Sequence, residues 1–251
     1  MLTILFVAMA GLLIGSFLNV VIYRLPRGET VVFGRSYCPG CRRVLAWYDL
    51  IPLVSYIILR GRCRYCGGRI SPRYPLVELT TGAVFAALFY RLGPGWVLVK
   101  YLFLACFLIA ASFIDLEHYL IPDRLIFAGL LVGGGFLLSN REITIGSGFL
   151  GALSAAGLLW LLALASRGNV GGGDIKLAAV VGLFMGWPWG LGAVLGGLFL
   201  AGAAGAFLLA LRVKGRKDPL PLAPFLSAGA LVAFFWGPQI LAWYAGLLGV
   251  G

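Results

Sequence analysis

Long apolar segments run through almost the whole chain, and they constrain its fold more than any other feature. Eight can be recognised, at residues 2–23, 75–91, 96–114, 123–139, 146–166, 174–188, 190–211 and 222–247. Most of them approach the ~20 residues that a helix needs to cross a bilayer. Because 61% of the 251 residues are hydrophobic and only 12% are charged, too little polar surface remains for a soluble domain of this size. The sequence therefore predicts an all-α polytopic membrane protein with about eight transmembrane helices.

A single polar stretch interrupts this pattern and defines the expected domains. Residues 1–23 form the first transmembrane helix, residues 24–74 form an insert, and residues 75–251 form a membrane domain with the remaining helices. No Lys or Arg precedes the first apolar run, whereas Arg24 and Arg27 follow it at once. Charges after the run and none before it favour an uncleaved first helix with its N-terminus outside, rather than a signal peptide.

The distribution of basic residues predicts the orientation of the chain. If the eight segments alternate, the insert and the loops at 115–122, 167–173 and 212–221 share one side of the membrane. That side carries all but three of the 20 basic residues, the exceptions being Arg91, Lys100 and Arg141. Loops rich in Lys and Arg stay in the cytoplasm. We therefore expect a multi-pass protein of the cytoplasmic membrane, with the insert in the cytoplasm.

Four cysteines in the insert form two CxxC motifs that are typical of a zinc site. Cys38 and Cys41 make the first motif, and Cys63 and Cys66 make the second after 21 intervening residues. Two such turns supply four thiolates for a tetrahedral zinc ion, and a site closed in this way is structural rather than catalytic. Two disulfides or a redox pair are the alternatives, although disulfides are rare in the cytoplasm. We expect a zinc-ribbon-like insert, in which the metal stabilises a domain with little core.

The insert is both basic and apolar, which bears on its partners. Ten of the 20 basic residues lie between Arg24 and Arg73, and all ten are arginine. Such a charge suits nucleic acid, which zinc ribbons often bind. Aromatic and aliphatic residues nevertheless fill the stretch from Trp47 to Ile58, between the two CxxC motifs. We therefore expect the insert to lie on the anionic headgroups of membrane lipids, with no nucleic-acid partner.

Two acidic clusters at the ends of apolar segments are the candidates for chemistry. The first runs from Asp115 to Asp123, and the second is Gly171-Gly172-Gly173-Asp174. The predicted topology puts both at the cytoplasmic edge of the membrane, where carboxylates are costly and commonly functional. Two carboxyl groups in one site suggest acid/base hydrolysis of a peptide that itself lies in the membrane.

Each carboxylate also has a structural interpretation. Asp174 fits the N-cap of a helix that follows a glycine loop, and Asp123 fits the first turn of a helix after Pro122. The protease motifs GxSxG and HExxH do not occur in the sequence. The segment from Asp174 to Trp187 has 14 residues, or about 21 Å of helix, against a bilayer core of ~30 Å. Either the bilayer is thinner there or the glycine loop dips below its surface.

Further motifs flank these clusters along most of the chain. They are GSFLNVVIYRLP (15–26), the two CxxC motifs, IPLVSY (51–56), RGRCR (60–64), YPLVE (74–78), ID (114–115) followed by PD (122–123), and GGGDIK (171–176). With these motifs in this order, the chain resembles the type IV prepilin peptidases. That family comprises the leader peptidases and N-methyltransferases of type IV pili, type II secretion and competence pseudopili.

The resemblance implies an eight-span aspartyl protease of the GxGD type, with Asp115 and Asp174 as the catalytic pair and Asp123 as the reserve candidate. One carboxyl group would be ionised and would activate water, while the other would be protonated and would donate to the scissile carbonyl. The substrates would be prepilins or pseudopilins with a short basic leader, cut at the cytoplasmic face of the bacterial inner membrane. The family then methylates the new N-terminus, using S-adenosylmethionine.

Three other functions remain open at the level of the sequence. A GxGD protease without methyltransferase activity would use the same acidic clusters. An ion-coupled transporter would use the intramembrane acids, but the insert occurs once and the two halves differ, so no inverted repeat supports it. A membrane-tethered zinc ribbon that only binds a partner would leave both acidic clusters unexplained.

Overall fold

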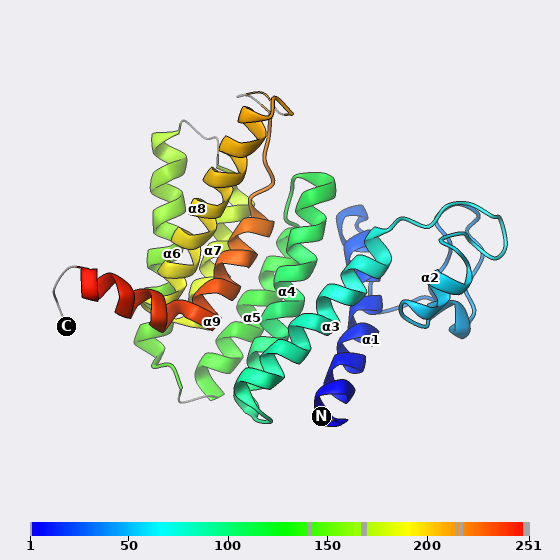
Figure 1. The fold of residues 1–251 in the computed structure, drawn as a ribbon, viewed down its shortest axis with the longest axis horizontal. Coiled ribbons are helices and arrows are strands. Elements are labelled where there is room, and N and C mark those ends of the chain that lie inside the picture. The colour runs from blue at the N-terminus through cyan, green and yellow to red at the C-terminus, as the bar shows by residue number, and fades with distance from the viewer. Residues whose placement is uncertain (1, 140–141, 167–169, 214, 216–217, 248–251) are drawn as a thin grey trace. The chain divides into compact units, whose positions relative to one another are not determined.

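The computed structural model describes residues 2–139, 142–166, 170–213, 215 and 218–247 (Figure 1). Arg141 and parts of the loops at 167–173 and 212–221, which entered the topology argument, lie outside this set. Within the described residues, the regular elements are all helical, apart from two isolated bridges, Tyr37 with Val44 and Arg62 with Arg69. The prediction of an all-α chain is therefore confirmed.

The long helices coincide with the eight apolar segments. They are α1 (Leu2–Arg24), α3 (Arg73–Leu92), α4 (Trp96–His118), α5 (Asp123–Ser139), α6 (Ile145–Ala165), α7 (Gly172–Met185), α8 (Trp189–Ala210) and α9 (Ala223–Leu247). Between α1 and α3, the insert carries only the short helices η1 (Leu25–Arg27), η2 (Trp47–Leu50) and α2 (Val54–Ile58). The insert thus lies between the first and second long helices, as expected.

Length separates these helices into two groups. Six of them are long and apolar enough to cross a membrane, namely α1, α3, α4, α6, α8 and α9. The other two are shorter, since α5 has 17 residues and α7 has 14. The short helix predicted after the glycine loop, the sixth of the eight apolar segments, is therefore present, although α7 begins at Gly172 and not at Asp174.

The chain divides into two compact units, Met1–Phe113 and Ile114–Gly251. The cysteines lie in the first unit, and all three candidate aspartates lie in the second. The separation of the first helix, the insert and the membrane domain at residues 24 and 75 stays a prediction.

In the first unit, α1 packs along α3 at very close range. A Cβ atom at Gly11 would lie 2.8 Å from Gly82 Cα, and one at Gly15 would lie 2.7 Å from Glu78 Cα. The glycines therefore let the two backbones touch, which is how helices associate when lipid removes the hydrophobic drive between them. Asn19 adds a polar tie, because its buried Nδ2 donates to the carbonyl of Tyr74 at 3.1 Å.

In the second unit, the short helix α7 contacts α5, α6, α8 and α9 (Figure 1). Its side chains from Leu177 to Met185 are almost all buried. The backbone of α7 contacts the backbone of α6 at Gly182, because a Cβ atom at this position would collide with the carbonyl oxygen of Gly151 in α6. The backbone of α8 also contacts α7 at this residue, because a Cβ atom at Gly190 in α8 would lie 2.5 Å from Gly182 Cα. The helix that carries Asp174 is thus held tightly along its length.

Candidate active site and cysteine cluster

Asp115 lies one turn before the end of α4 and is 5% exposed. The helix ends at His118, because Tyr119 adopts a left-handed φ of 53° while its N–H bonds to the Asp115 carbonyl at 2.9 Å. The Asp115 carboxylate accepts a hydrogen bond from the backbone N–H of Ala223 at 3.0 Å, and another from Leu222. These donors come from the N-terminal end of α9, where a helix has unpaired N–H groups to offer. They hold a buried carboxylate in a fixed orientation.

Asp174 occupies the third position of α7, since Gly171 is the N-cap residue. Its carboxylate accepts a hydrogen bond from the backbone N–H of Gly171. An acidic side chain that reaches back from the third position to the N-cap N–H is one half of a capping box. The structural interpretation of Asp174 as the N-cap itself is therefore wrong by three residues, because the two preceding glycines already belong to the helix.

Contacts between the two acidic clusters confirm that they meet. A Cβ atom at Gly173 would lie 3.2 Å from Ile121 Cβ, so glycine at this position lets α7 approach the turn before α5. One helical turn away, Lys176 Nζ lies 2.5 Å from Asp123 Oδ1. The carboxylates of Asp115 and Asp174 are close enough for their charges to interact. The fold thus gathers all three candidate aspartates around the N-terminus of α7.

Asp123 differs from the other two aspartates in its surroundings. Its side chain is 79% exposed and forms the ion pair with Lys176. It stands at the first position of α5, where an acidic residue is favoured by the helix dipole. These features agree with its structural interpretation, whereas Asp115 is buried and Asp174 is half-buried.

Sequence reasoning did not identify the groups that orient the two inner carboxylates. The donors at Leu222, Ala223 and Gly171 are backbone N–H groups, which a sequence pattern does not mark as functional. The only available signal was the Pro-rich start of α9, where helix N-termini expose such donors. Two carboxyl groups whose charges interact, each held by backbone donors, have the makings of an acid and a base that act on one water molecule.

The four cysteines of the insert form one cluster. Their sulfur atoms lie within 4.8 Å of one another, and the Sγ atoms of Cys38 and Cys66 are 4.0 Å apart. Zn–S bonds of ~2.3 Å in a tetrahedron separate the sulfurs by about 3.8 Å. The set therefore fits a single tetrahedral metal ion. All four are free cysteines and none is in a disulfide.

The two CxxC motifs fold as near copies, displaced by 25 residues in the sequence. In the first, Cys38 N–H bonds to the Arg43 carbonyl at 2.9 Å and Arg42 N–H to the Cys38 carbonyl at 2.8 Å. In the second, the same two bonds join Cys63 to Gly68 and to Gly67 at 2.8 and 2.9 Å. Gly67 has a left-handed φ of 69°, and Arg42 occupies the equivalent place with a φ of 57°. The left-handed position that a glycine occupies in the second motif is thus occupied by an arginine in the first.

The surroundings of the thiols favour binding of a cation. Burial alone would raise the pKa of the Cys63 thiol. Hydrogen bonds from the backbone N–H groups of Tyr65 and Cys66, and from the thiols of Cys38 and Cys66, outweigh burial and lower this pKa to about 7. For Cys66, the Gly68 N–H lowers the pKa, yet the Cys63 and Cys41 sulfurs outweigh it and raise the pKa to about 11. Crowded thiols therefore resist ionising together, and a divalent metal ion relieves that repulsion.

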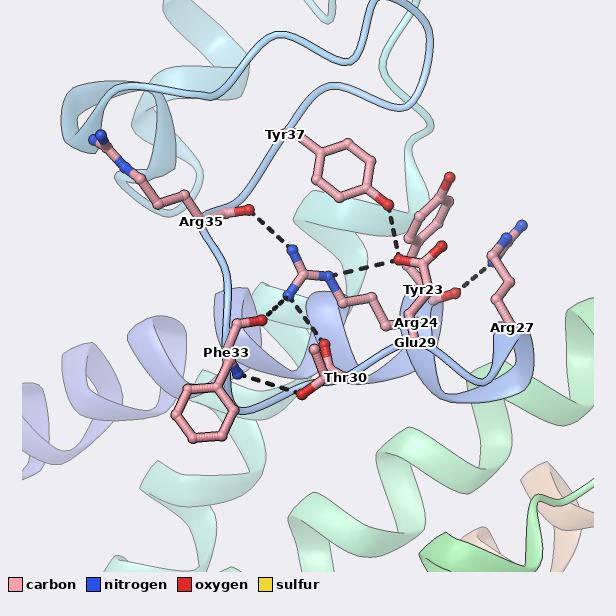
Figure 2. Close-up of polar contacts among 8 residues, drawn as sticks. All are labelled: Tyr23, Arg24, Arg27, Glu29, Thr30, Phe33, Arg35 and Tyr37. Carbon is pink, nitrogen blue, oxygen red and sulfur yellow. Dashed lines mark hydrogen bonds and ion pairs between the residues drawn. The ribbon is translucent and has the colours of Figure 1, made fainter.

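Arg24, at the end of α1, organises the chain that leads to the first CxxC motif (Figure 2). Its guanidinium donates hydrogen bonds to three backbone carbonyls, those of Thr30 (3.2 Å), Phe33 (3.4 Å) and Arg35 (2.9 Å). It also lies 5.4 Å from the ring centroid of Tyr37, within the range of a cation–π interaction. Tyr37 immediately precedes Cys38, so this buried arginine connects the membrane helix to the cysteine cluster.

Comparison with known proteins covers both parts of the chain. Residues 9–92 match the Bacterial Peptidase A24 N-terminal domain, and residues 102–210 match the Type IV leader peptidase family. The first match includes the four cysteines, and the second includes the three candidate aspartates. No solved structure matches the chain.

Several curated proteins are similar over nearly the full length. The Prepilin leader peptidase/N-methyltransferase of Aeromonas hydrophila is 36% identical over 267 residues, which cover 93% of this chain and 91% of the relative. That of Bacillus subtilis (strain 168) is 36% identical over 248 residues, covering 97% of this chain and 98% of the relative. That of Myxococcus xanthus (strain DK1622) is 41% identical over 223 residues, covering 85% of this chain and 65% of the relative.

Proposed function

The chain belongs to the type IV leader peptidase family, and from this membership we propose that Asp115 and Asp174 are the catalytic pair with which it cleaves prepilins or pseudopilins. It is an enzyme of the aspartic protease class, and the names of its relatives include both leader peptidase and N-methyltransferase activities. The observation that carries the assignment is the meeting of the buried Asp115 carboxylate with the half-buried Asp174 carboxylate, both oriented by hydrogen bonds from backbone N–H groups.

The proposed reaction uses one carboxyl group as a base and the other as an acid. The ionised carboxylate takes a proton from water as the water oxygen attacks the scissile carbonyl carbon, and the protonated one donates to the carbonyl oxygen. Collapse of the tetrahedral intermediate breaks the C–N bond: the departing amine takes the proton that the first carboxylate removed from water, and the second carboxylate takes back a hydroxyl proton. Asp123, exposed and paired with Lys176, is left outside these steps.

The methyl group is proposed to come from S-adenosylmethionine, which supplies an electrophilic methyl to an amine. The free N-terminus produced by cleavage is the nucleophile, so methylation follows cleavage. Within the described residues we assign no group of side chains to this donor. A protease without methyltransferase activity is the narrower alternative, and the names of the relatives favour the bifunctional enzyme.

The metal of the cysteine cluster is proposed to be zinc in a structural role. Its support is the spacing of the four sulfurs and the closed all-thiolate ligand set. Cys38, Cys41, Cys63 and Cys66 would be the ligands, and the metal would fix the fold of the insert.

We propose that the chain lies in the bacterial inner membrane with its N-terminus outside and the insert in the cytoplasm. The support is the excess of basic residues on the side of the insert. Asp115 and Asp174 then face the cytoplasm, where the leader of a prepilin is accessible.

The test is a two-part assay of the purified full-length protein in phospholipid. A prepilin is added together with S-adenosylmethionine that carries a labelled methyl group. We expect the pilin to be shortened and the label to appear only on the shortened form. Shortening without label, at saturating donor, would favour the protease-only alternative, and an intact prepilin would contradict the proposed function.

A further inference from the structure

A buried carboxylate of α3 binds the backbone of the insert at an unexpected depth. Glu78 is 7% exposed, and its Oε2 accepts a 2.9 Å hydrogen bond from the backbone N–H of Leu53. The same carboxylate accepts a hydrogen bond from the hydroxyl of Ser16 in α1. Leu53 immediately precedes α2 and holds a left-handed φ of 59°, which is costly for a residue with a branched side chain. The contact therefore fixes the start of α2 against the two membrane helices.

The positions of these partners along their helices give the depth of the contact. Ser16 lies eight residues before Arg24, the last residue of α1, and Glu78 lies five residues after Arg73, the first residue of α3. At ~1.5 Å per residue, these offsets are about 12 Å and about 7.5 Å from the helix ends. The 23 residues of α1 span about 34 Å, only slightly more than the ~30 Å of the hydrocarbon core. Leu53 is therefore level with the interior of α1 and α3, not beyond their ends, and two helices that cross a bilayer would hold it within the membrane.

The side chains that follow Leu53 are apolar and exposed, as expected for a segment in contact with lipid. Val54, Ile57 and Ile58 fall on one face of α2 and are 48%, 71% and 68% exposed. Trp47, at the start of the neighbouring η2, is 76% exposed. Apolar side chains in such a group are unusual on a surface that meets water. A tryptophan beside aliphatic residues is typical of segments that lie in the membrane interface.

The charges around this face favour anionic lipid. Arginines follow α2 closely in the sequence, at 60, 62, 64 and 69. Asp49, the acid of the neighbouring η2, is already engaged, because its carboxylate accepts from Arg64 at 2.8 Å and from the Tyr65 hydroxyl at 3.2 Å. The remaining cationic groups are available to phosphate headgroups.

We propose that residues 47–58 form a monotopic element that inserts its apolar face into the cytoplasmic leaflet of an anionic bilayer, and that Glu78 holds it at that depth. The insert is then attached to the membrane at a third place, in addition to α1 and α3. The cysteine cluster is consequently kept beside the bilayer surface. This inference goes beyond the proposed function and does not depend on the identity of the catalytic residues.

The test maps contact with acyl chains in the full-length protein. Nanodiscs of phosphatidylglycerol contain a phospholipid with a photoactivated diazirine in its acyl chain, and adducts are located by mass spectrometry of tryptic peptides. The peptide Val44–Arg60 contains the whole apolar face, and Ser36–Arg42, around the first CxxC motif, is the internal control. We expect Val44–Arg60 to be labelled severalfold more than Ser36–Arg42, and more in phosphatidylglycerol than in phosphatidylcholine. Equal labelling of the two peptides would overturn the proposal, and equal labelling in the two lipids would remove the anionic preference.

Variants at Glu78 test whether its hydrogen bond sets the depth of residues 47–58, and labelling of α1 shows whether the membrane helices remain folded. Glu78→Ala removes the acceptor for Leu53, so labelling of Val44–Arg60 should fall to the level of Ser36–Arg42 while labelling of α1 is unchanged. Glu78→Gln keeps an acceptor oxygen and should retain the wild-type pattern. If the peptide is unlabelled in the wild-type protein and becomes protected from hydrogen exchange only when a prepilin is added, the apolar face binds the substrate instead, and the lipid assignment is wrong.

Discussion

The backbone N–H of Ala223 donates a 3.0 Å hydrogen bond to Oδ2 of Asp115, and the two residues are separated by 108 positions in the chain. Ala223 is the first residue of α9, so the Asp115 carboxylate also satisfies a donor that the start of a helix leaves without an intrahelical partner. Asp115 therefore supports the fold as well as its proposed chemistry. Experiments on this residue must separate the two roles.

Substituting either proposed catalytic aspartate with asparagine should abolish cleavage while preserving the fold. Asp115→Asn and Asp174→Asn keep an acceptor oxygen for their N–H partners, and even complete loss of a cap costs only ~1 kcal/mol. The acid/base pair acts as a unit, so the double variant should lose little more than either single variant. The measurement is prepilin cleavage by protein whose metal content and melting temperature match the wild type. Normal cleavage by Asp174→Asn would contradict the aspartyl mechanism.

Asp123 is expected to be dispensable for chemistry. Its ion pair with Lys176 is exposed, and such pairs contribute about 0–1 kcal/mol. Asp123→Asn should therefore retain measurable cleavage and lower the melting temperature only slightly, and Lys176→Gln should behave in the same way as its matched control. An inactive Asp123→Asn alongside an active Asp115→Asn would reassign the catalytic residue within the first cluster.

The cysteine cluster should hold about one zinc ion per chain, as a closed all-thiolate site does. Combining Cys38→Ser with Cys41→Ser should release the metal and make the insert sensitive to protease between residues 24 and 74. Elemental analysis of reductively purified protein measures the metal. Cys106→Ser is the control and should keep it, since Cys106 lies in α4. Finding no zinc in the wild-type protein would rule out the assignment.

Arg24→Lys should loosen the chain between α1 and the first CxxC motif. The guanidinium reaches three carbonyls at once (Figure 2), a geometry that a lysine ammonium does not reproduce. Hydrogen bonds from charged donors contribute about 1.5–3 kcal/mol each. Amide exchange in residues 28–37 should accelerate, whereas Arg27→Lys, at an exposed position, should leave it unchanged. Equal exchange in both variants would show that Arg24 does not order this segment.

A pair of glycine substitutions tests the packing of α7. Gly182→Ala would force a Cβ atom into the backbone of α6, and overpacking of this kind typically costs about 1–3 kcal/mol. Gly134→Ala in α5 meets nothing within 4 Å, so it should be neutral or should stabilise the helix by up to ~1 kcal/mol. Melting temperatures of the two variants in the same detergent should therefore move in different directions, or only the first should move.

The sequence was sufficient for the helices because lipid imposes a simple rule. A backbone that crosses a bilayer must satisfy its own hydrogen bonds, so each apolar segment becomes a helix whatever its neighbours are. The short sixth helix could be predicted from the length of its apolar segment. The cluster of Cys38 and Cys41 with Cys63 and Cys66 could be predicted from the spacing of the two CxxC motifs.

Contacts made by backbone atoms could not be predicted in this way. The Asp115 carboxylate accepts a hydrogen bond from the backbone N–H of Ala223 in α9. The Glu78 carboxylate accepts one from the backbone N–H of Leu53 in the insert. Any residue except proline offers the same N–H group, so the sequence does not indicate which one is used. The left-handed turn at Arg42 was also missed, because glycine is the usual signal for it.

The backbone contact at Gly182 determines how α7 is rotated about its own axis. Asp174 precedes Gly182 by eight residues, and each residue advances a helix by about 100°. Since Gly151 and Gly190 meet α7 at Gly182 without an intervening side chain, the helix has one angular setting in which it fits. The direction in which the Asp174 carboxylate leaves the helix is thus specified from two turns away. Inserting one residue between them would keep every side chain of the active site and turn Asp174 about 100° away from Asp115.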